Sequence, residues 1–358
     1  MKIIQLMPEF EIAGAEIMCE NLTHALIKLG HEVVVVSMYN KHTSITDRFE
    51  KAGIKIVYLH KKSGFDISII GKIRRVFKQE NPDVIHTHRY LARYAIPAAV
   101  FSGVKRRVHT LHSVATKEVG ALDRKLNNFF YRHLNMYPVA ISPEVKKTIV
   151  DVYKLPDDKI GVVNNGIDIS KCIQKQDYNF SNEIVFLHVG RFQDVKNHFG
   201  IIRAFSIMHK QFPNTRLRFY GQGELEGKCK ELVASLDLTK AVDFCGTTDK
   251  INQIMHESDA FLLCSHYEGM PMTLIEAMST GLPIVATRVG GIVDMIDDEE
   301  NGFLCDDNEQ SISNAMIRII SVSESYRRKM GESAIAKAAC FTSNSMAKGY
   351  LDIYKKLV

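Results

Sequence analysis

This chain of 358 residues lacks long apolar runs, C-x-x-C pairs and the pattern of a signal peptide. No apolar run approaches the roughly 20 residues that a helix needs to cross a bilayer, so any membrane contact must be peripheral. The seven cysteines are an odd number and never form a C-x-x-C pair, which favours reduced thiols in a cytosolic compartment. The start, MKIIQLMPEFEIAGAE, soon reaches acidic residues and has no small-residue cleavage site. We therefore expect no signal peptide and a cytoplasmic protein.

Several catalytic motifs are also missing. The sequence has no P-loop lysine motif and no G-x-S-x-G elbow, which disfavours kinase and esterase functions. A dinucleotide fingerprint continued from Gly221 would need glycine where Glu226 stands. No D-x-D pair of aspartates is present to hold a divalent metal beside a diphosphate. We therefore expect neither a cofactor nor a metal ion.

The charge of the chain is unevenly distributed. Residues 1–166 contain 25 Lys and Arg against 16 Asp and Glu, a net charge of +9, whereas the remainder has a net charge of −4. The segment SIIGKIRRVFK places Ile70, Ile73 and Phe77 on one helical face and cations on the other. Such a helix suits an anionic bilayer surface, although most helices of this kind only cover a protein surface. Nucleic-acid binding is disfavoured, because the basic excess is spread out and lacks a recognised motif.

Strand and helix patterns alternate along the whole chain. In the first half, strands are expected at KIIQLM, HEVVVVSM, IKIVYL, DVIHTH, RRVHTLH, PVAISP and IGVVNNG, and helices over residues 15–29, 67–80 and 122–134 and after Pro143. Consecutive valines indicate a strand that is buried on both faces. This alternation predicts a largely parallel sheet with right-handed crossovers.

A polar, aperiodic stretch over residues 170–182 is typical of a linker, and a second alternating series follows it. Strands are expected at EIVFLHV, TRLRFYG, AVDFCG, AFLLC and IVATRV, and helices over residues 198–211, 225–236, 252–257, 309–320 and 344–357. The fold class is therefore α/β, with two doubly wound, Rossmann-like domains facing each other across a cleft. The expected boundaries are 1–168 for the first domain and 169–339 for the second.

The stretch CSHYEGMPMTLIEAMSTGLPIVATRVGG forms one strand, loop, helix and strand unit. In open α/β sheets, the loop after a strand's carboxyl end faces the ligand crevice. Pro271 suits the first helical position, and the following amides of Met272, Thr273 and Leu274 are free donors that suit an anion. Glu276 lies one turn further on, where its carboxylate can accept two ribose hydroxyls, and Glu268 can reach another part of the same ligand. Alternatively, Glu276 only complements the helix dipole and Glu268 is a solvated loop residue.

Two further loops of the second half follow strands and are expected to converge with the Glu268 loop. One carries Arg191 and Lys196, and the other carries Gly221 and Gly223 in YGQGEL. A guanidinium and an ammonium commonly hold a diphosphate, and glycines permit close approach of the backbone. Taken alone, these are ordinary loop charges and a strand-to-helix turn.

In the first half, the loop IAGAE places Gly14 after the first strand, and histidines follow other strands in IHTH and HTLHS. A zinc site is disfavoured, because neither histidine pair lies on a helix with a nearby glutamate and no third ligand is evident. We expect His112, at the edge of the crevice, to touch substrate.

Together these motifs resemble those of the retaining glycosyltransferase family 4, which has the GT-B fold. They are GAE after the first strand, VGRF followed by Lys196, YGQGEL, and above all EGMPMTLIEAM, with Glu268 and Glu276 eight residues apart. The resemblance covers essentially the whole chain. The first loop departs from the family's double-glycine form, because Ala13 precedes Gly14.

The resemblance implies transfer of a sugar from a nucleotide-sugar donor, commonly UDP-linked, with retention of configuration. Arg191 and Lys196 would then bind the diphosphate, Glu276 the ribose, and Glu268 hydroxyls of the transferred sugar, while Gly14 and His112 would approach the donor from the acceptor-side domain. Residues 340–358 would form a helix that crosses back to the first domain. The expected acceptor is a saccharide or a lipid-linked saccharide, as in surface polysaccharide assembly at a membrane face. Two alternatives remain open: a nucleotide-sugar epimerase or hydrolase of the same fold, and a non-catalytic sugar-binding protein.

Overall fold

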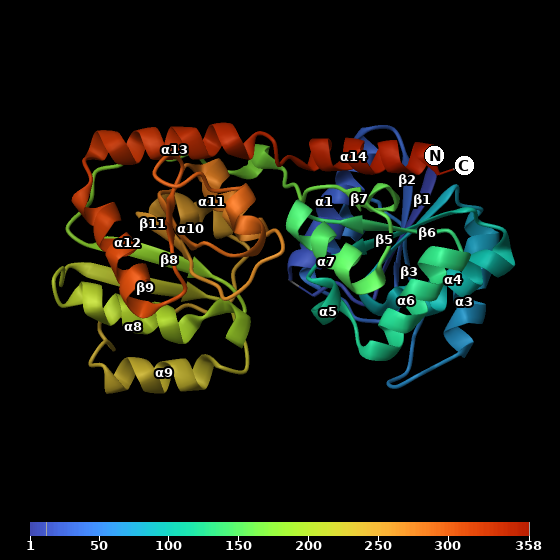
Figure 1. Cartoon of the computed structure of the whole chain (residues 1–358), viewed down its shortest axis with the longest axis horizontal. Coiled ribbons are helices and arrows are strands. Elements are labelled where there is room, and N and C mark those ends of the chain that lie inside the picture. The colour runs from blue at the N-terminus through green and yellow to red at the C-terminus, as the bar shows by residue number, and fades with distance from the viewer. Residues whose placement is uncertain (12, 358) are drawn as a thin grey trace. The chain divides into compact units, whose positions relative to one another are not determined.

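The computed structural model describes residues 1–11 and 13–357. Two residues lie outside the described residues. They are Ile12, in the loop expected after the first strand, and Val358, the last residue of the helix expected over residues 340–358. The chain divides into two compact units: Met1–Ile167 together with Thr342–Val358, and Asp168–Phe341 (Figure 1). The last helix is therefore part of the first unit.

The first unit is built on a seven-stranded sheet in which every strand pair is parallel. The strand order is β3-β2-β1-β4-β5-β6-β7. The strands are β1 (Lys2–Met7), β2 (Glu32–Ser37), β3 (Ile56–Tyr58), β4 (Val84–His88), β5 (Arg106–Leu111), β6 (Met136–Ala140) and β7 (Gly161–Val162). The strand order reverses between β1 and β4, and ligands of doubly wound sheets bind at the carboxyl ends beside this switch point.

The helices of the first unit connect these strands. They are α1 (Gly14–Lys28), α2 (Ser44–Lys51), α3 (Ser68–Glu80), α4 (Ala92–Ser102), α5 (Ala115–Glu118), α6 (Ala121–His133) and α7 (Pro143–Tyr153), with short 3-10 helices η1 (Arg89–Leu91) and η2 (Asp157–Lys159). The last helix of the chain, α14 (Ser343–Lys356), also belongs to this unit, and the 3-10 helix η3 (Ile169–Lys171) begins the second unit. The sequence did not predict α2 or α4. Pro97 lies inside α4, and most of that helix is buried, which removes the apolar period that would have revealed it.

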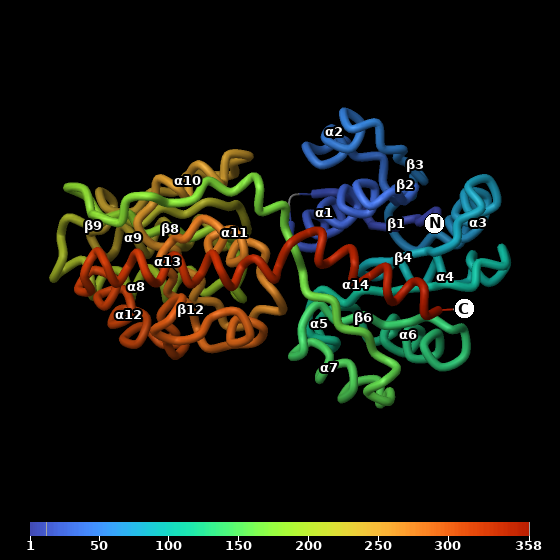
Figure 2. The backbone as a smooth tube through the Cα atoms, turned by 90° about the horizontal axis from the view of Figure 1, so that it is seen from above, coloured from blue at the N-terminus to red at the C-terminus, as the bar shows by residue number. Residues whose placement is uncertain are grey.

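Helix α3 packs beside α4 in the first unit (Figure 2). Ile73 and Phe77, on the apolar face that could have met a bilayer, are 0% and 2% exposed and belong to the core of this unit. The cations Arg74, Arg75 and Lys78 remain exposed. The apolar face of α3 is thus used within the fold, as in most amphipathic surface helices.

The second unit contains a six-stranded parallel sheet with the order β10-β9-β8-β11-β12-β13. The strands are β8 (Ile184–Val189), β9 (Thr215–Tyr220), β10 (Val242–Phe244), β11 (Ala260–Leu263), β12 (Ile284–Thr287) and β13 (Phe303–Cys305). The order reverses between β8 and β11, so the switch point lies between the loops that carry Lys196 and Glu268.

The helices of the second unit are α8 (His198–His209), α9 (Glu226–Ser235), α10 (Ile251–Glu257), α11 (Met272–Thr280), α12 (Glu309–Ser321) and α13 (Glu324–Ala338), with 3-10 helices η4 (Asp194–Lys196) and η5 (Gly290–Asp294). The sequence did not predict β13 or α13. β13 is three residues long, and α13 has a weak apolar period, so neither carried a pattern long enough to interpret.

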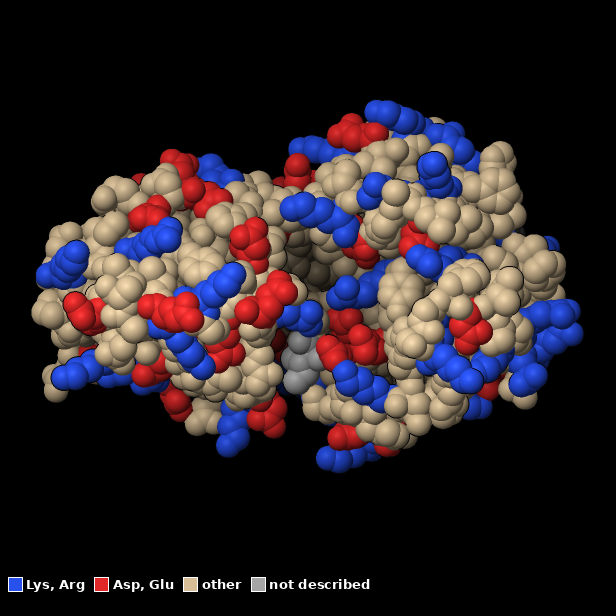
Figure 3. Space-filling model, turned by 90° about the horizontal axis from the view of Figure 1, so that it is seen from below, with Lys and Arg blue, Asp and Glu red and all other residues tan. Residues whose placement is uncertain are grey.

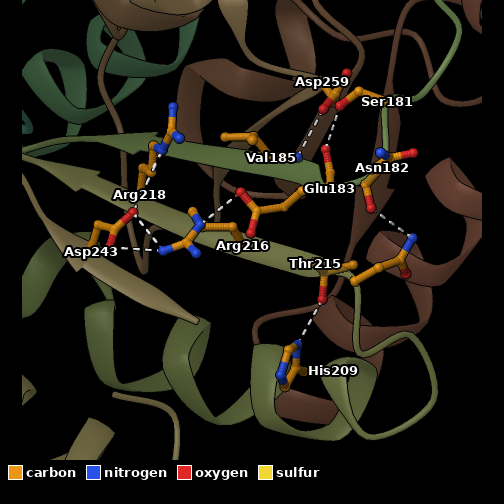
Figure 4. Close-up of polar contacts among 11 residues, drawn as sticks. Ser181, Asn182, Glu183, Val185, His209, Thr215, Arg216, Arg218, Asp243 and Asp259 are labelled. Carbon is orange, nitrogen blue, oxygen red and sulfur yellow. Dashed lines mark hydrogen bonds and ion pairs between the residues drawn. The ribbon is translucent and has the colours of Figure 1, made fainter. Parts of the chain in front are cut away.

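Ion pairs and a buried carboxyl tie the strands of the second sheet together near their amino ends (Figure 4). Arg216 on β9 contacts Glu183 at 2.8 Å and Asp243 on β10 at 3.1 Å. Asp259, just before β11, accepts a hydrogen bond of 2.8 Å from the amide of Val185 on β8. These contacts leave the opposite, carboxyl edge free to carry loops.

The predicted linker contains no helix or strand over residues 172–183, all of which are described. It still packs against the second unit. The Lys175 amide donates to the Thr280 carbonyl at 2.8 Å, and the buried Tyr178 hydroxyl donates to the Gly281 carbonyl at 2.9 Å. The segment is therefore fixed at the carboxyl end of α11.

The surface mixes charges of both signs, as the face drawn in Figure 3 shows. All seven cysteines are free. None of the helices in the described part of the chain combines the length and the apolar character needed to cross a membrane.

Candidate functional site

Three loops leave the carboxyl edge of the second sheet, after β8, β9 and β11, and they hydrogen-bond to one another. The Phe192 amide donates to the Gln222 carbonyl at 3.1 Å, which joins the first loop to the second. The His266 amide donates to the Val195 carbonyl at 2.9 Å, which joins the third loop to the first. The loops that the sequence placed at one edge therefore form one connected structure.

Lys196 and Glu268 meet at the centre of this structure. The Lys196 ammonium lies 2.6 Å from Glu268 Oε1, and the Ser265 hydroxyl donates to the same oxygen at 2.6 Å. Glu268 is 8% exposed. Within residues 1–11 and 13–357, no hydrogen-bond donor contacts Glu268 Oε2. That oxygen is available to accept a hydrogen bond from a ligand hydroxyl.

The backbone of Glu268 is held by the segment that follows β12. The Gly291 amide donates to the Glu268 carbonyl at 3.0 Å. A Cβ on Gly290, whose φ is +50°, would lie 1.9 Å from that carbonyl oxygen. Thr287 adds a bond of 2.6 Å from its hydroxyl to the Ser265 carbonyl. The sequence did not predict these roles for Ser265, Thr287 and Gly290, although the paired glycines at the end of VGG were a visible signal.

Arg191 begins the loop that ends at Lys196. Its side chain is exposed, and it makes no ion pair with any residue that the structure describes. Arg191 therefore provides a solvent-accessible cation near the start of the loop, whereas the charge of Lys196 is already paired with Glu268. The structure brings Lys196 and Glu268 into direct contact and places Arg191 on the same loop.

The start of α11 differs from the prediction. Pro271 is not the first helical residue: its backbone is extended, with φ −75° and ψ 123°, and Met272 begins the helix. The Leu274 amide is not free, because it donates to the Pro271 carbonyl at 3.2 Å. The amides of Met272 and Thr273 have no acceptor among the described residues. Two donors, one fewer than predicted, remain for an anion at this helix start.

Glu276 lies on α11 one turn beyond these amides. Its carboxylate makes no hydrogen bond or ion pair with the part of the chain that the structure describes. Burial without a neighbouring cation raises the pKa of this carboxyl to about 7. Ligand hydroxyls that donate hydrogen bonds to this carboxyl would stabilise its ionised form.

Gly221 and Gly223 are required by contacts between loops. A Cβ on Gly221, whose φ is +149°, would lie 2.0 Å from the Gly190 carbonyl oxygen, and one on Gly223 would lie 2.4 Å from the Phe192 carbonyl oxygen. These glycines allow the loop after β9 to pack on the loop after β8. They thereby shape the backbone around Arg191.

A polar network that the sequence analysis missed supports the base of the first loop. Asn197, with φ +52°, caps α8, and its side chain donates to the Cys264 carbonyl at 3.1 Å and to Asp307 at 2.9 Å. Asp307 also contacts the ring of His266 at 2.5 Å. Asp307 could not be linked to this network from the sequence, because its partners Asn197 and His266 lie far away along the chain. A cavity of about 560 Å³ borders this network, and its lining does not include Lys196 or Glu268.

In the first unit, His112 follows β5 and is held by a buried histidine. His112 Nε2 lies 2.9 Å from His88 Nδ1, and His88 Nε2 lies 2.9 Å from the Gln5 side-chain oxygen. Because an amide oxygen only accepts, His88 carries its proton on Nε2 and accepts at Nδ1. His112 then carries its proton on Nε2, which leaves its Nδ1 as an acceptor.

Burial and neighbouring histidines keep this group of rings neutral. Burial lowers the pKa of His88 to about 3, and burial with repulsion from His88 lowers the pKa of His112 well below its usual value. His86 is bonded to Tyr354 and Thr110 at 2.7 Å each, and His109 is bonded to Thr87 at 2.9 Å. These hydrogen bonds give each of the four histidines a protein partner.

Gly14 is the exposed first residue of α1, and no side chain caps this helix start. A Cβ on Gly14 would meet no atom within 4 Å. The backbone amide is therefore accessible at the carboxyl end of β1, on the same sheet edge as His112.

Two family models match the chain. The model for group 1 glycosyl transferases matches residues 171–337, and the model for glycosyltransferase family 4 matches residues 12–171. Among curated proteins, the chain is 26% identical to the N-acetyl-alpha-D-glucosaminyl L-malate synthase of Bacillus anthracis, over 96% of this chain and 94% of that protein. It is 29% identical to the UDP-Gal:alpha-D-GlcNAc-diphosphoundecaprenol alpha-1,3-galactosyltransferase of Escherichia coli, over 71% and 70%.

Solved structures resemble the whole chain. A glycosyltransferase from Rickettsia africae superposes with a TM-score of 0.84 at 21% identity, over 99% of this chain and 98% of that one. Anabaena HepE in complex with UDP and glucose superposes with a TM-score of 0.86 at 19% identity, over 100% of both chains. With the two parallel sheets described above, these similarities confirm the predicted fold class, a two-domain, Rossmann-like GT-B fold.

Proposed function

The chain belongs to the group 1 glycosyltransferases, the family whose motifs it resembles, and from this premise we propose that it transfers a sugar from a UDP-sugar with retained configuration. The Lys196 and Glu268 pair carries the proposal. It places one cation and one free carboxylate oxygen, each fixed by neighbouring loops, at the switch point of the second sheet.

The donor site is assigned from Arg191 and two helix amides, which the fold leaves unpaired, and from Lys196, whose ammonium keeps N–H donors beyond its contact with Glu268. Arg191, Lys196 and the amides of Met272 and Thr273 would bind the diphosphate, because all four offer positive charge or N–H donors. Glu276 would accept the ribose hydroxyls, and Gly14 would offer its amide from the first unit. UDP is proposed as the nucleotide because HepE was solved with UDP and glucose and the E. coli relative is named for a UDP-linked donor.

The chemistry that suits these groups is a front-face substitution. The bond between the anomeric carbon and the diphosphate oxygen breaks, the acceptor oxygen bonds to the same face of that carbon, and the acceptor proton passes to the leaving phosphate. Lys196 and Arg191 stabilise the charge that develops on the diphosphate. Glu268 Oε2 accepts a hydroxyl of the transferred sugar and so holds the ring in place. Because two side-chain cations offset this charge, we propose that the reaction needs no metal ion and no cofactor.

For the acceptor, we propose a saccharide or a lipid-linked saccharide, used in surface polysaccharide assembly. The E. coli relative is named for a diphosphoundecaprenol acceptor, and the first half of this chain has an excess of cations that would favour an anionic membrane surface. The exposed cations of α3 would make such contact peripheral. Weak binding to anionic vesicles at low salt, lost at high salt, is the expected behaviour.

The test is a panel of nucleotide-sugars, screened by thermal shift and then by product analysis with saccharide acceptors. Glu268→Ala and Lys196→Ala should each lower turnover by roughly 10²- to 10³-fold, the usual cost of losing one electrostatic stabiliser. Lys228→Ala and Glu231→Ala change exposed residues of α9 and are the controls. Near-normal turnover in either site variant would refute the assignment. Epimerised or free sugar formed without acceptor would indicate an epimerase or a hydrolase instead.

A further inference from the structure

A separate pocket of about 280 Å³ lies in the first unit, on loops that follow β2, β3 and β4. Its lining consists of four aromatic residues, two cations and a glycine: Tyr39, Phe65, Tyr90, Tyr94, Lys61, Arg93 and Gly64. The three strands are parallel neighbours or flank β1, so the pocket opens at the carboxyl edge of the sheet. Loops at this edge of a doubly wound sheet bind ligands.

The aromatic side chains give the pocket a surface suited to a sugar ring. The hydroxyls of Tyr39 and Tyr90 lie 3.4 Å apart, and the ring of Phe65 stacks on Tyr94 at 5.9 Å. Phe65 is nevertheless 73% exposed. A large apolar ring held at a pocket rim with most of its surface in water is available to a ligand, and the apolar face of a pyranose can stack on it.

Lys61 is a buried cation that makes no direct ion pair, although its charge helps to lower the pKa of the exposed Asp66 carboxyl. It is 8% exposed, and its ammonium donates to the carbonyls of Lys62, at 2.9 Å, and Gly64. No acidic side chain forms an ion pair with it in the described ranges 1–11 and 13–357. An ammonium has three donors, so one remains after the two carbonyls are satisfied. Buried charges are normally paired, and a ligand anion would supply the missing charge.

Arg93 adds a second cation, and this one is neutralised by the protein. Its guanidinium lies 5.8 Å from the ring of Tyr90 and 5.9 Å from that of Tyr94, and it pairs with the buried carboxylate of Asp123. Asp66 and Lys72 also lie near Lys61, and the five groups Lys61, Lys72, Arg93, Asp66 and Asp123 together carry a net charge of +1. The pocket therefore favours an anionic group at its polar end.

One residue of the pocket lining, Tyr90, lies close in sequence to the histidine that holds His112. Tyr90 is two residues beyond His88, whose ring contacts His112 at 2.9 Å. The pocket and His112 lie at the same edge of the sheet, because Tyr90 follows β4 and His112 follows the neighbouring strand β5. A ligand in the pocket would extend towards the residue expected to touch substrate.

We propose that this pocket holds the acceptor, and that the acceptor is a saccharide carrying an anionic group, phosphate or carboxylate. The sugar ring stacks on Phe65, and the anion is bound by Lys61 and Arg93. This inference rests on the proposed function, because it names the chemical class of the acceptor for that reaction. The anionic group can belong to a soluble acidic sugar or to the diphosphate of a lipid-linked sugar.

The test measures binding to the full chain by ligand-observed NMR, with UDP in excess so that the donor site is occupied. The probes are glucose 1-phosphate, glucuronic acid and methyl glucoside, plus a prenyl diphosphate sugar in neutral detergent. We expect at least one anionic probe to bind about tenfold more tightly than the methyl glucoside, the gain typical of one charge-assisted hydrogen bond. Binding confined to the prenyl probe identifies the lipid-linked source, and binding of the free acids identifies the soluble one.

Charge variants make the inference specific to this pocket. Asp123→Asn frees Arg93 and should tighten binding of the anionic probe, whereas the double variant Arg93→Gln/Asp123→Asn should weaken it by about tenfold without leaving Asp123 unpaired. Phe65→Ala should weaken charged and neutral probes alike. Arg74→Gln, an exposed cation on α3, is the control.

Equal binding of charged and neutral probes, or wild-type affinity in the double variant, would overturn the proposal. These measurements need no turnover, so the pocket can fail while sugar transfer stands. Failure of the proposed function would instead appear as loss of donor-dependent product with probe binding intact.

Discussion

At the scale of single residues, the hydrogen-bonding state of His112 depends on His88. Gln5 fixes the proton of His88 on Nε2, and His88 in turn accepts from His112. His112 is thereby left with an acceptor at Nδ1, suited to a sugar hydroxyl. His88 is a positioning residue in this scheme, since it acts through the ring of His112.

We expect His88→Phe, which keeps a buried ring but removes the acceptor, to lower turnover by roughly tenfold, as lost outer partners do at other sites. The ring ¹⁵N shifts of His112 should also show a change of tautomer. His109→Phe changes a buried ring that is bonded to Thr87 and not to His112, and it is the control. An unchanged His112 spectrum in His88→Phe would show that His88 does not set the tautomer of His112.

Glu276 makes donor binding dependent on pH. Its pKa of about 7 in the free protein means that ionisation must precede acceptance of two ribose hydroxyls. Affinity for a UDP-sugar should therefore fall as the pH drops below about 7, by up to about tenfold per pH unit. Titration calorimetry from pH 5.5 to 8 would measure this slope. Glu276→Gln should remove it, and the exposed Glu231→Gln should not.

The same pKa gives the opposite sign for stability of the free protein. Glu276 is raised from its ordinary value of 4.5, so its contribution is fully present below that value and is lost as the pH rises through about 7. Thermal unfolding without donor should show this loss, and Glu276→Gln should reduce it. Identical pH profiles for the wild type and the variant would show that Glu276 is not the titrating group.

At the scale of elements, the segment after β12 fixes the loop after β11. A Cβ on Gly290 would approach the Glu268 carbonyl oxygen to 1.9 Å, so Gly290→Ala must displace that backbone. We expect a loss of activity comparable to Glu268→Ala, with thermal stability also reduced. Gly30→Ala is the matched control, because Gly30 has φ +82° but open space around a Cβ. It should cost only the left-handed strain, about 1–2 kcal/mol, and leave activity intact.

Elements with strong local patterns were predictable, and elements defined by tertiary contacts were not. The valines of β2 and the strand, loop and helix around Glu268 have unambiguous patterns, and both are present. Helix α4 contains Pro97 and is buried nearly all round, so its residues show neither a polar face nor a typical helix interior. Helix α13 packs Gly331 tightly against Tyr178, a contact that no local pattern encodes.

The candidate site divides in the same way. Residue types at strand ends indicated that Lys196 and Glu268 belong together, because loops at the carboxyl edge converge. The sequence could not show that Ser265 shares the Glu268 oxygen or that Asp307 joins two loops, since those distances depend on the folded backbone. The role of Gly221 was also beyond reach, because its closest neighbour is the carbonyl of Gly190 and not an external group.

At the scale of the whole molecule, the first unit is completed by the end of the chain. Helix α14 packs on α1, and two of its tyrosines hydrogen-bond to side chains of the sheet. The Tyr350 hydroxyl lies 2.8 Å from that of Thr110 on β5, and the Tyr354 hydroxyl lies 2.7 Å from the ring of His86 on β4. Both tyrosines are fully buried. The amide of Ser343 also donates to the Ile167 carbonyl at 2.7 Å, so the helix begins beside the point where the first segment of this unit ends.

The double variant Tyr350→Phe/Tyr354→Phe should therefore weaken the first unit selectively. Leaving Thr110 and His86 without these partners should cost about 1–3 kcal/mol for each buried group. Hydrogen exchange should accelerate in β4, β5 and α1 and stay unchanged in β8 and β11. Tyr326→Phe, which removes a bond of 2.7 Å to the Glu299 carbonyl in the second unit, should leave exchange in the first unit unchanged. Equal acceleration across both sheets in the double variant would show that α14 stabilises the chain as one cooperative body, contrary to the division into two units.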